Sequence, residues 1–175
     1  MWFLIAITLA FAETKDAELS LRFESIQAKL LKSKGKVALR QLKEIERSLE
    51  TSKGIIAPSD LVNLWMYQGY AYHLQGKTEE SEKAFEKMLS VGISARLDPK
   101  LNADAKLLAS IEKIRDAVKG TPVIDFNIPR ISKSNKYYIN GLPPYGSREI
   151  YRGNHLVQAK CLDGRVVSRW DNLRR

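Results

Sequence analysis

Apolar residues recur at three- and four-residue steps from about residue 15 to residue 118, which is the spacing of one face of a helix. Glycine, proline and small polar residues interrupt this pattern at Ser33–Lys36, Ser52–Gly54, Pro58–Asp60, Gln75–Thr78 and Asp98–Pro99. The pattern therefore predicts five helices, the last over residues 101–118. That helix is expected to turn five apolar side chains inward, namely Leu107, Leu108, Ile111, Ile114 and Val118.

Two of the predicted helix ends carry residues that favour particular caps. Gly54 follows the second helix, and a glycine at that point can adopt the left-handed conformation in which many helices end. Thr78 precedes Ser81 and Glu82, so we expect it to provide the N-terminal cap of the fourth helix.

The spacing of apolar residues changes after Gly120-Thr121-Pro122, where short β-forming runs replace the helical pattern. These runs are Val123–Ile128, Tyr137–Ile139, Ser147–Tyr151, His155–Leu162 and Arg165–Trp170. Asn140-Gly141 indicates a turn, and Asp163-Gly164 predicts a hairpin because both residues tolerate positive φ. We therefore predict an α+β fold, with a helical domain over residues 13–119 and a small antiparallel β module over residues 120–175.

The first twelve residues are almost entirely apolar and end in Ala10-Phe11-Ala12. Signal peptidase accepts such a small-x-small ending, so we predict a signal peptide over residues 1–12 with cleavage after Ala12. The run is shorter than the roughly 20 apolar residues that a helix needs to cross a bilayer. No Lys or Arg precedes it, which leaves open a start further upstream or a buried N-terminal helix or strand.

The formal net charge of +9 is concentrated in the β module. From Gly120 onward the chain has ten Lys and Arg residues against four Asp and Glu residues. Five of these cations are candidate contacts for an anionic partner: Arg148, Arg152, Lys160, Arg165 and Arg169. They are interleaved with aromatic residues, as in nucleic-acid-binding surfaces, although a solvated strand face explains the pattern equally well.

The sequence lacks the residue patterns of common catalytic sites. Cys161 is the single cysteine, so no disulfide can form within the chain, and the only histidines are His73 and His155. There is no phosphate-binding loop, dinucleotide fingerprint or zinc-ligand spacing. We therefore predict a protein that is not an enzyme and needs no cofactor, metal or small-molecule substrate, and we expect His155 to have a structural role.

Five residues of the helical domain have the spacing of a known repeat signature: Trp65, Gly69, Tyr72, Gly76 and Phe85. This segment resembles one tetratricopeptide repeat, in which the first glycine lets two antiparallel helices approach and the second turns the chain. Three positions depart from the preferences of that family: Gln68, Ser81 and Met88. The closing proline is displaced to Pro99. Such repeats need neighbouring helices, which we expect on both sides.

The β module carries four short motifs in a characteristic order: Tyr138–Gly141, Tyr145-Gly146, Gly153–Val157 and Asp163-Gly164. In this order they resemble the PEGA domain, a small extracytoplasmic β module of bacteria. The motif that names the family is absent, and so is the threonine-proline pair before its central strand. The resemblance implies association with proteins or the cell wall and no catalytic role.

These features together predict a non-enzymatic, periplasmic, protein-binding adaptor or scaffold of the bacterial envelope. The expected binding surface is the concave side of the helical hairpins, where repeat proteins present the side chains of their inner helices. Tyr67, Tyr70 and His73 are the candidate residues on that side. The partner would be an envelope protein, with cell-wall glycan or another anionic surface as a further partner. The alternative is a binder of anionic surfaces or nucleic acid that uses the basic β module.

Overall fold

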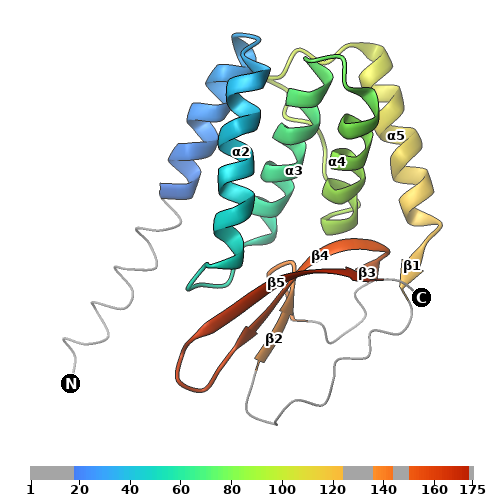
Figure 1. The fold of residues 1–175 in the computed structure, drawn as a ribbon. Coiled ribbons are helices and arrows are strands. Elements are labelled where there is room, and N and C mark those ends of the chain that lie inside the picture. Colours follow the sequence, from blue (N-terminus) through green and yellow to red (C-terminus); the bar gives the residue numbers. More distant parts are fainter. Residues whose placement is uncertain (1–17, 124–135, 144–149, 174–175) are drawn as a thin grey trace.

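The computed structural model describes residues 18–123, 136–143 and 150–173 of the chain. The predicted signal peptide, Arg148 and the Tyr145-Gly146 motif lie outside these residues. In the described part, helices come first and strands follow (Figure 1). The helices are one described over residues 18–31, α2 (Gly35–Glu50), α3 (Pro58–His73), α4 (Thr78–Val91) and α5 (Ala105–Lys119).

The strands form a small antiparallel sheet that lies across one end of the helices (Figure 1). Its order is β2 (Lys136–Ile139), β4 (Gly153–Lys160) and β5 (Val166–Leu173). A separate short pair joins β1 (Pro122–Val123) to β3 (Ile150–Tyr151), also antiparallel. The predicted α+β fold class, with helical hairpins followed by a small antiparallel β module, is confirmed.

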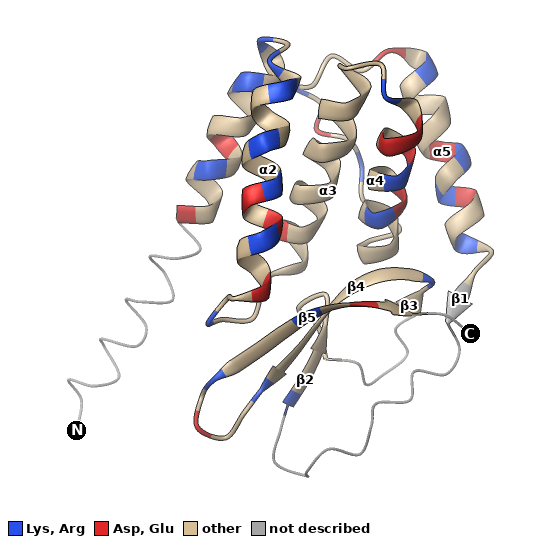
Figure 2. Cartoon of the chain, in the orientation of Figure 1, with Lys and Arg blue, Asp and Glu red and all other residues tan. Residues whose placement is uncertain are grey.

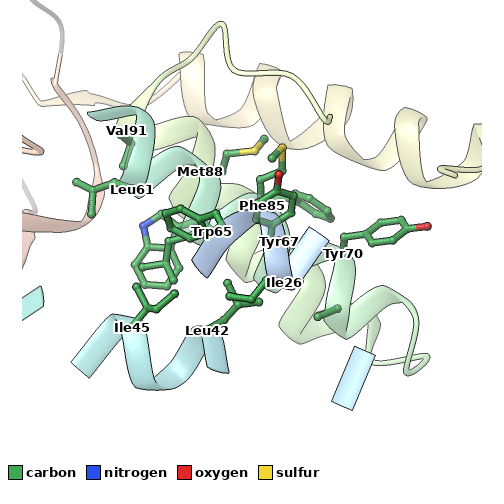
Figure 3. Packing of buried hydrophobic residues seen from close by; sticks show 14 of the residues in the cluster. Ile26, Leu42, Ile45, Leu61, Trp65, Tyr67, Tyr70, Phe85, Met88 and Val91 are labelled. Atoms are coloured by element: carbon green, nitrogen blue, oxygen red, sulfur yellow. The ribbon is translucent and has the colours of Figure 1, made fainter. Parts of the chain in front are cut away.

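The α3–α4 hairpin packs as the signature residues predict. A Cβ atom at Gly69 would lie 2.7 Å from Cε1 of Phe85, so only glycine allows the two helices to approach this closely. Ser81 Oγ donates a hydrogen bond of 2.8 Å to the carbonyl oxygen of Gly69 and ties the same two helices together. Gly76 has a φ of +69° and turns the chain between them. Figure 3 shows Trp65 and Phe85 within the resulting core.

The helices and the strands share one hydrophobic core. Tyr151 and Leu156 of the strands belong to the same cluster of buried residues as the helix side chains. The rings of Trp65 and Trp170 meet edge to face, with centroids 5.3 Å apart. Gln158 is fully buried, and its side chain accepts a hydrogen bond from the amide of Ile56 at 2.9 Å. The β module is thus packed against the helices through both apolar and polar contacts.

The last helix departs from the prediction in its start and its direction. It begins at Ala105, four residues later than expected, because the Asp104 carboxylate accepts a hydrogen bond from the amide of Leu107 and caps it there. Leu108, predicted to face inward, is 47% exposed. Helix α5 also runs parallel to α4 (Figure 1), and Asp104, just before α5, lies 3.9 Å from His73, close to the turn at which α4 begins. A further repeat would require an antiparallel helix at this point.

Two smaller expectations about caps were wrong, and one about a hairpin turn was confirmed except for one residue's backbone conformation. Gly54 does not have positive φ; its amide is instead held by Ser52 Oγ at 3.3 Å. Thr78 is the first residue of α4 rather than its cap, and no side chain caps that end. The β4–β5 hairpin forms as predicted, but its loop spans residues 161–165 and only Gly164 of the Asp-Gly pair has positive φ.

Within the described ranges, no helix combines the length and the apolar character that crossing a membrane requires.

Candidate functional site

The expected concave binding surface is covered by the chain itself. Because α5 runs parallel to α4, residues 92–104 must return along the length of the helices, and they cross the face of α3 that carries the two candidate tyrosines. The Tyr67 hydroxyl donates to the Asp98 carboxylate at 3.3 Å, and the Tyr70 hydroxyl donates to the carbonyl oxygen of Asn102 at 3.1 Å. Both side chains are buried, at 6% and 4% exposure, so the prediction that they are exposed was wrong.

We call residues 92–104 the return segment, and several further contacts hold it in place. Asp98 accepts a hydrogen bond from the Gln27 side chain, and its amide lies 3.2 Å from Sδ of Met66. The buried guanidinium of Arg115 donates to the carbonyl oxygens of Ile93 and, at 2.8 Å, of Ala95. These contacts come from the first helix, α3 and α5, so the return segment is an integral part of the helical core.

The environment of Tyr67 also keeps its hydroxyl neutral. Burial raises the pKa of Tyr67 to about 12, and the negative charge of Asp98 adds to the effect. A pKa above the ordinary value means that the neutral form is favoured by folding. This contribution to stability is complete below about pH 10 and is lost as the pH rises toward about 12.

His73, the third candidate, lies at the end of α3 with its side chain 34% exposed. Its Nε2 atom is 3.9 Å from the carboxylate of Asp104, and its ring centroid is 6.0 Å from that of Tyr70. The structure therefore brings the three predicted residues close together on one face of α3. It leaves only His73 substantially accessible to a partner.

The candidate basic residues that the structure describes in the β module do not form one surface. Arg165 Nε donates to Asp163 at 2.6 Å, and Arg169 Nη2 donates to Asp171 at 2.9 Å, so both charges are partly neutralised locally. Because side chains alternate along a strand, the β4–β5 register places Lys160 and Arg169 on opposite faces of the sheet. Arg152 is exposed at the β3–β4 junction. Figure 2 shows Lys and Arg residues at separate points of the β module.

A groove lies where the first helix, the α2–α3 connection and β4 meet, and we call it the junction groove. Its volume is about 780 Å³, within the range of about 300–1,000 Å³ found for ligand sites. Apolar side chains contribute to its lining: Leu19, Leu49, Ile55 and Ile56. Three cations line it too, namely Arg22, Lys53 and Lys160. Only Lys160 among them was a candidate from the sequence.

The cations of the junction groove differ from Arg165 and Arg169 of the β4–β5 hairpin, each of which is paired with an aspartate. Among the described residues, Arg22, Lys53 and Lys160 form no ion pair. Two carboxylates, those of Glu18 and Asp60, line the same groove. The groove thus combines an apolar lining with an excess of positive charge, which suits a ligand that has both apolar and acidic groups.

His155 has the structural role predicted for it. The residue is fully buried, its Nδ1 atom lies 2.7 Å from Nδ2 of Asn140, and its Nε2 atom lies 2.7 Å from the carbonyl oxygen of Tyr151. The Asn140 side-chain oxygen in turn accepts from the amide of Leu156 at 3.0 Å. Both ring nitrogens are therefore engaged in joining β4 to neighbouring segments. Across residues 18–123, 136–143 and 150–173, no group of three or more metal-ligating side chains was found.

The comparisons with known proteins found no relative of this chain. No family model matches the chain, and no curated protein or solved structure is significantly similar to it. The likeness of the helical hairpin to a tetratricopeptide repeat, and of the strands to a PEGA domain, therefore depends on the residues described above.

Proposed function

We propose that this chain is a non-enzymatic protein-binding adaptor of the bacterial envelope, and that it contacts its partner through the junction groove. The observation that carries the proposal is the position of this groove between the helices and the β module. It presents apolar side chains from several elements, together with three cations that form no ion pair with another described residue. A surface of mixed apolar and polar character is typical of protein–protein contacts.

The two resemblances support an adaptor rather than an enzyme. The close approach of Gly69 to Phe85 is the packing that a tetratricopeptide-like hairpin requires. In the β module, His155 lies on a strand with the glycine-x-histidine-x-valine order of the PEGA-like motif, and its hydrogen bonds are structural. Both families are associated with binding. The proposed adaptor therefore combines a helical binding module with an extracytoplasmic β module.

Location in the envelope is proposed from the apolar N-terminal residues and from the PEGA-like character of the β module. Cleavage after Ala12 would leave a periplasmic chain that begins at Glu13. The alternative function, binding of anionic surfaces or nucleic acid by the β module, has less support because Arg165 and Arg169 are paired with Asp163 and Asp171.

The proposal is tested by using the chain from Glu13 to Arg175 as bait in an envelope extract, at low and at high salt. The chain is kept whole, because cutting it at Gly120 would expose the core that the helices and strands share. We expect a protein partner that is retained at high salt, because apolar contacts contribute much of the binding energy. Retention of only nucleic acid or glycan, lost steeply as salt rises, would support the alternative instead.

A further inference from the structure

We infer that the ligand of the junction groove is an extended acidic segment of the partner protein, with apolar side chains that contact the lining and carboxylates that contact the three cations. The inference rests on the proposed function, since it specifies which part of a protein partner the groove receives.

The lining of the groove is held in a fixed conformation. Gln158, which is fully buried in β4, accepts from the amide of Ile56 at 2.9 Å and donates to the carbonyl oxygen of Gly54 at 3.1 Å. The α2–α3 connection is thereby fastened to the sheet on both sides of Ile55. A preformed surface loses little conformational entropy on binding, which favours affinity.

The charge balance favours an acidic ligand. Arg22, Lys53 and Lys160 form no ion pair within the described residues, and their charges are therefore available to a ligand. Of the two carboxylates in the lining, Asp60 lies in the first turn of α3, where the positive end of the helix dipole offsets its charge. Glu18 remains, so the groove attracts anions more strongly than cations.

The distribution of the cations favours a peptide over a compact anion. Arg22 belongs to the first helix, Lys53 to the α2–α3 connection and Lys160 to the end of β4. A chain with several acidic residues can present a carboxylate to each of three cations that come from separate elements. Apolar residues between those acids would occupy the surface formed by Leu19 and Ile55.

The test compares two labelled peptides, one in which leucine alternates with glutamate and one in which leucine alternates with lysine. Fluorescence anisotropy measures their binding to the chain from Glu13 to Arg175. A groove variant carries Arg22→Glu, Lys53→Glu and Lys160→Glu. A control variant carries the same change of net charge at three exposed positions outside the groove: Lys36→Glu, Arg96→Glu and Lys113→Glu.

The unmodified chain is expected to bind the acidic peptide about tenfold more tightly than the basic one, because three charge pairs at the protein surface act together. The control variant should keep that preference, and the groove variant should reverse it. If circular dichroism shows that the groove variant is unfolded, the neutral changes Arg22→Gln, Lys53→Gln and Lys160→Gln replace it, and the preference should then disappear.

Equal affinity of the unmodified chain for both peptides would overturn the inference, and so would equal behaviour of the groove and control variants. The bait experiment separates this failure from failure of the proposed function. A protein partner captured by a chain that shows no peptide preference would leave the adaptor function standing and remove the acidic ligand. Peptide preference without any captured protein would count against the adaptor instead.

Discussion

Gly69→Leu is expected to be among the most destabilising single changes in the helical module. A Cβ atom at this position would lie 2.7–2.9 Å from three ring carbons of Phe85, whose side chain is buried and cannot move into open space. Overpacking of this kind costs roughly 1–3 kcal/mol. For a chain of this length such a loss lowers Tm by roughly 2–12 °C.

Thermal unfolding followed by circular dichroism measures this effect, with Lys77→Ala as the control. Lys77 is exposed, and a surface change of this kind usually alters the free energy of unfolding by less than about 0.5 kcal/mol. Adding Phe85→Leu to Gly69→Leu should recover part of the loss, because the two residues are in contact. Equal Tm shifts for Gly69→Leu and Lys77→Ala would remove the repeat-like interpretation of the hairpin.

Gly141→Ala is expected to cause the second large loss of stability, at the contact between the sheet and the α2–α3 connection. Gly141 has a φ of +77°, and a Cβ atom there would overlap the carbonyl oxygen of Ile56 and lie 3.1 Å from Cδ of Pro58. Gly164→Ala is a matched control, since Gly164 has a φ of +83° but nothing within 4 Å of an added Cβ.

Both alanine variants carry the cost of a left-handed conformation, about 1–2 kcal/mol. Only Gly141→Ala must also displace the α2–α3 connection, so its free energy of unfolding should fall by roughly 1–3 kcal/mol more than that of the control. Urea unfolding followed by tryptophan fluorescence gives the comparison. If both variants lose the same stability, the turn at Asn140-Gly141 is not packed beneath Ile56 as described.

The sequence was informative where structure depends on neighbouring residues. The helical spacing of apolar residues located all five helices, and Gly69, Gly76 and Gly164 lie where close approach or a turn requires glycine. Asn140-Gly141 likewise forms the predicted turn, with φ values of +49° and +77°. These features depend on residues that are close together in the sequence, so a sequence pattern is enough to predict them.

The features that the sequence could not predict depend on contacts between distant segments. The direction of α5 is set by the return segment, which is held by residues such as Asp98 and Arg115, and no local pattern specifies it. Tyr67 and Tyr70 were expected on an exposed binding face, but the return segment covers them and their side chains are buried. The junction groove is lined by both Lys53 and Lys160, which are far apart in the chain. One sequence signal could have indicated this groove: the apolar pair Ile55-Ile56 lies in a predicted loop, where apolar residues need a surface to pack against or to bind.

The central claim, that a partner protein binds at the junction groove, is tested most directly by photo-crosslinking in the cells that make this chain. A photoreactive amino acid replaces Lys53 in the groove or, as the control, the exposed Lys113 on α5. We predict a discrete protein adduct from position 53 alone, which mass spectrometry maps to a segment rich in acidic and apolar residues. An adduct formed only from position 113, or no adduct from either position, would contradict the claim.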